Sequence, residues 1–197
     1  SSMPAMATAS KPASRPHCLT SADNAAGEWP VPMACDGSPK RPAFPVTPLF
    51  LPDENATLAL GAALAPGLAP GMVITLRGEL GAGKTTLVRG LLRALGHAGR
   101  VKSPTYTLVE VYELSRLSLY HFDFYRFHDP SEWIDAGFRD IFNGRNACLV
   151  EWPERAMGQL PPADLEIALA VTEPGRSATL VACSPAGERL LAALPPS

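Results

Sequence analysis

Apolar residues fall into short blocks along most of the chain, and their spacing alternates between that of strands and that of helices. Residues 72–77 are rich in β-branched and apolar side chains, which predicts a strand. In residues 84–95 the apolar positions recur three or four apart, so this segment is predicted to be an amphipathic helix. An earlier helix is expected to begin after Asp53, a favourable N-cap, and to end at Pro66-Gly67.

Strand patterns dominate the second half of the chain. Strands are predicted over residues 105–113, 118–127, 147–152, 165–172 and 178–183. The Pro-Gly pair at 174–175 predicts a turn between the last two, and helical stretches are expected within 130–142 and 187–194. This order of elements predicts an α/β fold with a mixed, mostly parallel central sheet flanked by helices.

The first part of the chain shows neither the apolar spacing of a strand nor that of a helix. Residues 1–48 contain nine of the 21 prolines together with many Ser and Ala, a composition that offers little apolar surface to bury. We therefore expect a disordered extension over residues 1–45 and a single domain over residues 46–197. The length of 197 residues suits one domain with a sizeable core.

Composition narrows the class of protein. With 46% hydrophobic residues, 18% charged residues and a net charge of −2, the chain has no basic surface for binding RNA by itself. No apolar run is long enough to cross a bilayer, and the start lacks the apolar stretch of a signal peptide. Cys18, Cys35, Cys148 and Cys183 lack metal-ligand spacing. These features favour a reduced, cytoplasmic protein.

A glycine-rich loop joins the first predicted strand to the amphipathic helix. Its sequence, from Gly78 to Thr85, fits the pattern GxxxxGK[ST]. Glycines let successive backbone N–H groups turn inward around phosphate oxygens at the positive end of the following helix. Lys84 would reach the β and γ phosphates, and the Thr85 hydroxyl would bind magnesium. The loop therefore predicts binding of a nucleoside triphosphate with Mg²⁺.

A phosphate loop also needs a carboxylate at the end of a neighbouring strand, close to the magnesium ion. Glu151 ends an apolar strand and is the candidate, although a solvated acid at a strand end has the same pattern and Asp123 competes for the role. Strand alternation places His121, Asp123 and Tyr125 on one face. Asp123 could orient the attacking water, with His121 holding Asp123 or donating to phosphate. A hydrogen-bonded structural cluster is the alternative.

A run of hydroxyl-bearing residues precedes these strands. Ser103-Pro104-Thr105-Tyr106-Thr107 places hydroxyls where many nucleotide switches sense the γ phosphate. An ordinary entry into a strand has the same sequence pattern. The residues by themselves leave both interpretations open.

Together these motifs resemble the TsaE family, the P-loop ATPase subunit of bacterial tRNA threonylcarbamoyladenosine biosynthesis. The resemblance spans about residues 46–197 and leaves out the proline-rich extension. The segments that carry it are LPDENAT at 51–57, GELGAGKTT at 78–86, SPTYTLV at 103–109, HFDFYR at 121–126 and VEWP at 150–153. In combination these segments are far more specific than a phosphate loop alone.

The resemblance implies a role for each motif. It implies that Thr85 and Glu151 bind Mg²⁺ and that Asp123 is the functional strand acid. Glu54 and Arg176 would flank the base end of the nucleotide, although the residues by themselves look like solvated surface charges. Trp152 would shape the site, with a buried core tryptophan as the alternative. The implied phosphate loop consists of Gly81, Ala82, Gly83, Lys84, Thr85 and Thr86.

The resemblance also implies hydrolysis of ATP to ADP and phosphate, slow without partner proteins of the TsaB and TsaD type. Those partners would transfer a threonylcarbamoyl group to tRNA and carry most of the RNA binding. A small-molecule kinase is the main alternative, but the segment after Pro130 shows no clear lid. The lack of an Asn-Lys-x-Asp motif disfavours a GTPase. Asp123 and Glu151 together disfavour a module that binds nucleotide without hydrolysis.

Overall fold

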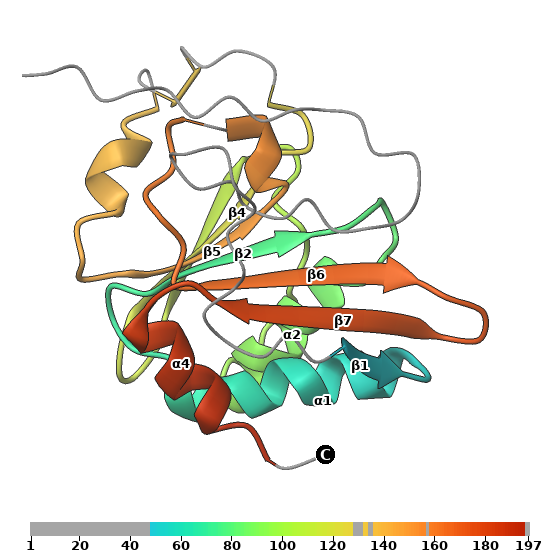
Figure 1. Cartoon of the computed structure of the whole chain (residues 1–197). Helices are drawn as coiled ribbons and strands as arrows, with labels where there is room; N and C mark the ends of the chain where they lie inside the picture. Colours follow the sequence, from blue (N-terminus) through green and yellow to red (C-terminus); the bar gives the residue numbers. More distant parts are fainter. Residues whose placement is uncertain (1–47, 128–131, 134–135, 157, 196–197) are drawn as a thin grey trace, which may run out of the picture. The chain divides into compact units, whose positions relative to one another are not determined.

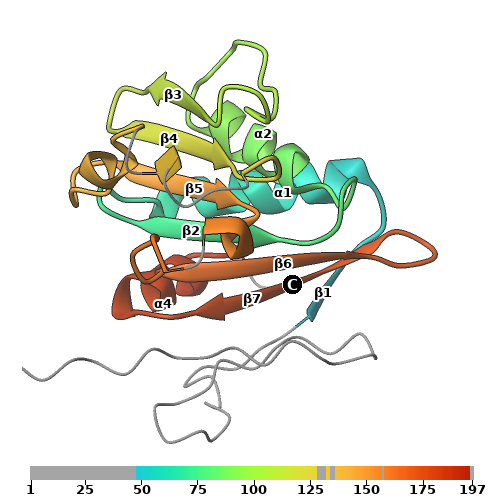
Figure 2. The same ribbon diagram turned by 90° about the horizontal axis from the view of Figure 1, so that it is seen from above.

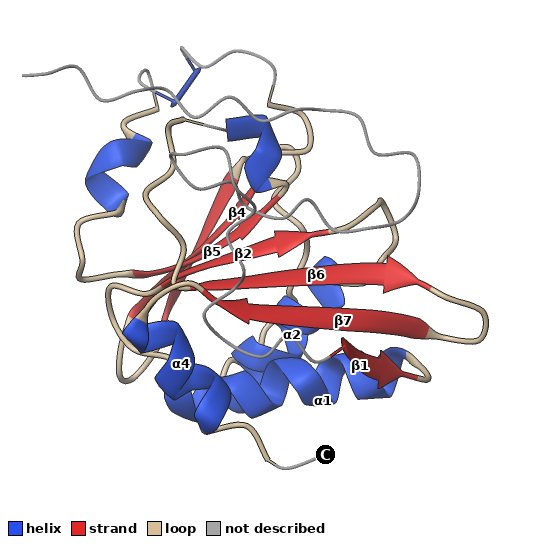
Figure 3. Ribbon diagram, viewed as in Figure 1, coloured by secondary structure: helices blue, strands red, loops and turns tan. Residues whose placement is uncertain are grey.

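A seven-stranded sheet forms the centre of the domain (Figures 1 and 3). The structure is a computed structural model, and it describes residues 48–127, 132–133, 136–156 and 158–195. The strand order is β1-β7-β6-β2-β5-β4-β3. The strands are β1 (Pro48–Leu51), β2 (Val73–Arg77), β3 (Val109–Glu113), β4 (Ser118–Asp123), β5 (Ala147–Glu151), β6 (Leu165–Val171) and β7 (Arg176–Ala182). The extension expected at residues 1–45 lies outside the described residues.

Parallel pairing at the centre of the sheet confirms the predicted fold class. β4, β5, β2 and β6 are parallel neighbours, while β3, β7 and β1 join through antiparallel pairs. Because β1 is antiparallel to β7 and β7 to β6, β1 runs in the same direction as the central strands. The carboxyl ends of β2, β5 and β4 consequently meet at one edge of the sheet, where open α/β sheets bind ligands.

Short 3₁₀ turns lie on one face of the sheet, and the α-helices cover the other (Figure 2). Two of them, α1 and α2, pack together so closely that a Cβ on Gly90 would lie 2.1 Å from the backbone oxygen of Leu58. Asp53 caps α1, as predicted, by accepting a 2.8 Å hydrogen bond from the Ala56 N–H. The helices are α1 (Glu54–Leu64), α2 (Lys84–Ala94) and α4 (Pro185–Ala192), with short 3₁₀ turns η1 (Ala65–Gly67), η2 (Phe138–Ile141) and η3 (Pro153–Ala156).

Two apolar clusters hold these layers together. Leucines of α1, α2 and the sheet form the first cluster, on the face that α1, α2 and α4 cover. The second lies on the opposite face and is largely aromatic. Ring contacts link Phe122, Phe124, Trp133 and Phe138 in this cluster. Phe122 and Phe124 thus pack away from α2, as strand alternation predicted. The polar side chains that alternate with these two phenylalanines point to the face that carries the glycine-rich loop.

Two strand predictions extended too far. The strand expected at 105–113 begins only at Val109, because Leu108 has a φ of 62° and its N–H bonds to the Pro104 oxygen in a turn. The strand expected at 118–127 ends at Asp123, after which the Phe124 N–H donates to the Glu151 oxygen and the chain turns. Both errors fall where the start of β3 lies beside the carboxyl end of β4, because turns there replace strand pairing.

Other differences concern the ends of the sheet and one helix. β1 was not predicted, since four residues are too few to establish a period. Arg176, expected in a turn, is the first residue of β7. Part of the helical stretch expected at 130–142 lies outside the described residues, and its last part is the 3₁₀ turn η2. Of the helices that the structure describes, none has the length and apolar content needed to cross a membrane.

Candidate functional site

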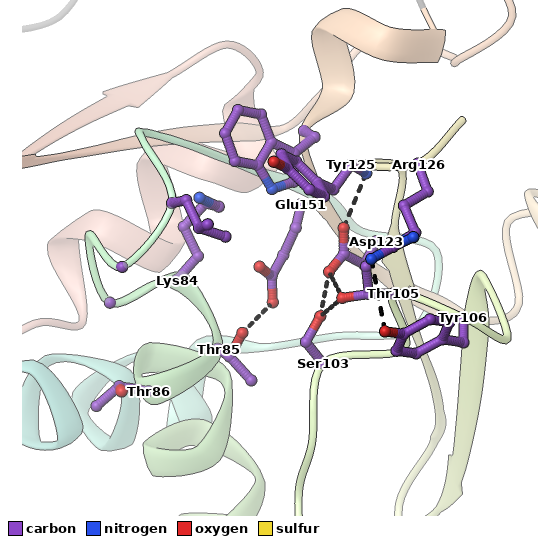
Figure 4. A pocket seen from close by; sticks show the side chains of 14 residues that line it. Lys84, Thr85, Thr86, Ser103, Thr105, Tyr106, Asp123, Tyr125, Arg126 and Glu151 are labelled. Carbon is purple, nitrogen blue, oxygen red and sulfur yellow. Dashed lines mark hydrogen bonds between the residues drawn. The ribbon is translucent and has the colours of Figure 1, made fainter. Parts of the chain in front are cut away.

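A cavity of about 410 Å³ opens at the carboxyl ends of β2, β4 and β5. The glycine-rich loop after β2 forms one side, and the segment 103–106 forms the other (Figure 4). Gly81 and Gly83 have φ values of 83° and 106°, in the left-handed region that glycine adopts without strain. Gly83 caps α2 without any side-chain hydrogen bond. The free N–H groups at the start of α2 therefore offer a site for an anion.

Lys84 lies within this loop and is only 4% exposed. Its Nζ donates to the backbone oxygens of Gly78 and Glu79, at 2.6 and 2.9 Å, and lies 4.0 Å from the centroid of the Trp152 ring. Burial lowers the pKa of Lys84, and the charges of Glu151, Asp123 and Glu154 oppose that shift. Because its hydrogen-bond partners are neutral, the ammonium can exchange them for charged phosphate oxygens.

Thr85 and Glu151 meet at the centre of the site. Thr85 Oγ1 donates to Glu151 Oε1 at 2.9 Å, which joins the start of α2 to the end of β5 (Figure 4). Glu151 is 2% exposed, and on its other side His121 Nε2 lies 2.8 Å from the same oxygen. A hydroxyl and a carboxylate are the hard oxygen ligands that Mg²⁺ uses when nucleotide phosphates complete its coordination. This pair of residues therefore fits Mg²⁺.

Asp123 is held by three other contacts. Ser103 and Thr105 donate from their hydroxyls to Oδ2, the latter at 2.7 Å, and the Tyr125 N–H donates to Oδ1 at 2.9 Å. His121 therefore contacts Glu151, and the alternative in which it holds Asp123 is wrong. The hydroxyls of Ser103 and Thr105 face the cavity and Asp123, which an ordinary entry into a strand does not require (Figure 4). Thr107 does not line the cavity, and its hydroxyl lies 3.5 Å from Glu110 Oε1.

Trp152 lies at the wall of the cavity. Its backbone has a φ of 58°, rare for a bulky residue, and its ring lies 5.0 Å from that of Tyr125. The side chain is partly exposed and contacts the Lys84 ammonium. Trp152 lines the cavity and also packs, partly buried, against the aromatic cluster, so the alternative of a buried core tryptophan is wrong.

The two residues expected at the base end of a nucleotide lie outside this cavity. Glu54 is exposed and forms a 3.2 Å ion pair with Arg89. Arg176 donates to Thr57 Oγ1 at 3.2 Å, and a Cβ on Gly83 would lie 2.6 Å from its Nη1. The sequence-based interpretation of Arg176 as a solvated surface charge is therefore wrong, because the partly buried guanidinium packs against Gly83 of the phosphate loop.

Sequence reasoning missed a pair of residues at the mouth of the cavity. Tyr106 is 84% exposed, and the Arg126 guanidinium lies 4.7 Å from the centroid of its ring (Figure 4). Both residues line the cavity together with Thr86 and Leu80. Each occurs in a motif of the sequence, but only the fold brings the two motifs together.

Comparison with known proteins identifies the family. The family model "Threonylcarbamoyl adenosine biosynthesis protein TsaE" matches residues 51–178. The chain belongs to the TsaE family. The matched range includes every candidate residue from Glu54 to Arg176, so the resemblance seen in the sequence motifs is confirmed.

Individual TsaE relatives support this membership. The chain is 42% identical over 149 residues to tRNA threonylcarbamoyladenosine biosynthesis protein TsaE of Haemophilus influenzae, a match that covers 73% of this chain and 94% of that protein. The protein of the same name from Bacillus subtilis is 44% identical over 119 residues, covering 60% and 72%. The crystal structure of YdiB from Bacillus subtilis superposes with a TM-score of 0.63 at 32% identity, covering 75% of this chain and 93% of that one.

Proposed function

We propose that this TsaE-family protein is a magnesium-dependent ATPase that takes part in forming threonylcarbamoyladenosine in tRNA, with partners of the TsaB and TsaD type in the cytoplasm. Membership of the family supports the pathway. The observation that carries the activity is the Thr85–Glu151 contact of 2.9 Å beside the phosphate loop. It joins the two oxygen ligands that a nucleotide-bound Mg²⁺ needs.

The phosphate loop would bind ATP through the phosphate groups of the nucleotide. The N–H groups of Lys84, Thr85 and Thr86 lie in the first turn of α2, where a helix has no acceptor of its own for them, and Lys84 adds a positive charge where the β and γ phosphates would lie. The net charge of −2 fits a subunit that meets protein partners and leaves RNA binding to them.

Thr85 and Glu151 would hold the magnesium ion. When bound, Mg²⁺ neutralises charge on the phosphate oxygens and orients them. The Thr85 hydroxyl can donate its proton to Glu151 while its oxygen keeps lone pairs for the metal. The contact between the two side chains is therefore compatible with metal binding.

Asp123 would act in hydrolysis by organising the side of the cavity opposite the phosphate loop. Its carboxylate fixes the hydroxyls of Ser103 and Thr105, which line the cavity. Through these contacts Asp123 can order the segment around the γ phosphate and orient the attacking water. Such a role affects turnover more than it affects binding of the ground state.

Asp123→Asn should lower ATP turnover by at least about tenfold, or roughly 1.4 kcal/mol, when turnover is measured with the partner complex. An amide retains the shape of the carboxylate, but it accepts hydroxyl donors less strongly because it has no charge. The ADP affinity should change much less.

Glu113→Gln is a matched control, because this exposed acid bonds to Ser118 at the opposite end of β3 from the site. Parental turnover in a folded Asp123→Asn protein would remove Asp123 from hydrolysis. If Asp123→Asn lowered ADP affinity and ATP turnover equally, Asp123 would instead be assigned to the magnesium site.

The activity is tested by measuring phosphate release from ATP with and without Mg²⁺, alone and with the partner proteins. Hydrolysis is expected only with Mg²⁺, and the partners should accelerate it. Release that requires an added small-molecule acceptor would favour the kinase alternative. Binding of ATP without any release, even in the presence of partners, would contradict the proposed ATPase.

A further inference from the structure

His121 is a buried histidine whose one polar side-chain contact among the described residues is with Glu151. The residue is 0% exposed, and Nε2 lies 2.8 Å from Glu151 Oε1. Nδ1 has no hydrogen-bond partner in the part of the chain that the structure describes. A buried imidazole with one unpaired nitrogen costs free energy, which an apolar side chain of similar size would avoid. Any specific contribution of the imidazole therefore comes through Nε2.

The direction of this hydrogen bond follows from the chemistry of its partner. A carboxylate that binds Mg²⁺ is ionised and can only accept, so in the proposed role Nε2 carries the proton and donates to Glu151. Thr85 Oγ1 donates to the same carboxylate oxygen, at 2.9 Å. Within the described residues, both side-chain donors to Glu151 thus converge on Oε1 and come from two elements, β4 and α2. This arrangement fixes the rotation of the carboxylate and leaves Oε2 available to the cavity that Glu151 lines.

The sheet register explains how His121 reaches this position. β4 and β5 are parallel neighbours, with His121 beside Leu149 and Asp123 beside Glu151. Residues two apart on a strand share a face, so His121 lies on the same face as Asp123. Glu151 is beside Asp123 in the sheet and shares this face, which is the side of α2. His121 is not among the residues that line the cavity. Its ring therefore supports Glu151 from behind, and direct donation to a phosphate is not open to it.

We infer that His121 is a positioning residue that holds the Glu151 carboxylate in the orientation needed to bind Mg²⁺. This inference rests on the proposed function, in which Glu151 is a magnesium ligand. Hydrogen bonds behind a metal ligand orient it, and their removal lowers metal affinity by about 10- to 100-fold in known sites. The expected effect is therefore on Mg²⁺ binding, and binding of ADP without metal should be unaffected.

The test uses Mg²⁺ titrations of the full-length chain at fixed ADP, followed by calorimetry, with ADP binding in EDTA as a second measurement. His121→Leu should raise the Mg²⁺ concentration at half-saturation by about tenfold and leave ADP binding in EDTA within about twofold. His121→Gln retains a donor that reaches Glu151 and should restore much of the affinity. Thr75→Val is the matched control, because it removes another buried polar group, on β2, that has no hydrogen-bond partner within the described ranges.

The outcomes separate this inference from the proposed function. A folded His121→Leu protein with parental Mg²⁺ affinity, alongside an impaired Glu151→Gln protein, would contradict the inference alone. An equal loss in Thr75→Val would also contradict it, because any core substitution would then have the same effect. If Mg²⁺ does not change the ADP affinity of the parent protein, the proposed function and the inference are both contradicted.

If circular dichroism shows that His121→Leu does not fold, a further pair of variants tests the inference. His121→Asn is polar but too short to reach Glu151, whereas His121→Gln reaches it. The inference expects weaker Mg²⁺ binding in the asparagine variant than in the glutamine variant. Equal Mg²⁺ affinities in these two proteins would overturn it.

Discussion

Lys84→Ala is expected to weaken ATP binding or hydrolysis by at least about 2 kcal/mol, which corresponds to about 30-fold. The ammonium lies inside the phosphate loop, where it donates to the backbone oxygens of Gly78 and Glu79. Burial lowers the pKa of Lys84, so incoming phosphate charge would stabilise its protonated form. Alanine removes that charge from a position that is 4% exposed, where no solvent ion replaces it easily.

ATP affinity and phosphate release should be measured on the parent, Lys84→Ala and a control, Lys102→Ala. Lys102 is exposed, so its loss should change neither quantity. The melting temperature should be recorded as well, because alanine leaves the oxygens of Gly78 and Glu79 without the ammonium donor. Parental binding and turnover in a folded Lys84→Ala protein would refute the assignment of the phosphate loop.

Glu151→Gln is expected to preserve the fold and to lower the magnesium-dependent part of ADP affinity by at least about tenfold, or roughly 1.4 kcal/mol. The amide oxygen can still accept from Thr85 and His121, so the local hydrogen bonds can persist. What is lost is the negative charge that a divalent cation requires. The measurement is a Mg²⁺ titration at fixed ADP.

Two further measurements make the Glu151 result specific. ADP binding in EDTA should not be weaker in Glu151→Gln than in the parent, because without the metal the substitution only removes a negative charge near the phosphate loop. Glu113→Gln, which alters an exposed acid at the far end of β3, should titrate as the parent does. Coincident Mg²⁺ titrations of Glu151→Gln and the parent would show that another acid is the ligand.

The sequence predicted those elements whose signals are local. β2, the glycine-rich loop and α2 follow one another without interruption, and their apolar spacing and glycines are sufficient to define them. The fold class and the family were also predictable, because several short motifs occur in a fixed order over the matched residues 51–178. Strand boundaries at the site were less predictable. β3 and β4 are shorter than expected because turns at Leu108 and after Asp123 replace strand pairing.

The tertiary structure alone decided which polar side chains meet. In the sequence, Asp123 and Glu151 compete for the place beside Thr85, and His121 has several possible partners. The parallel pairing of β5 with both β2 and β4 settles the arrangement: Glu151 contacts Thr85 and His121, whereas Asp123 contacts Ser103 and Thr105. The sequence by itself determined the local motifs and the alternation of faces, because both depend on neighbouring residues. Strand order and register bring together residues tens of positions apart, and no local pattern encodes them.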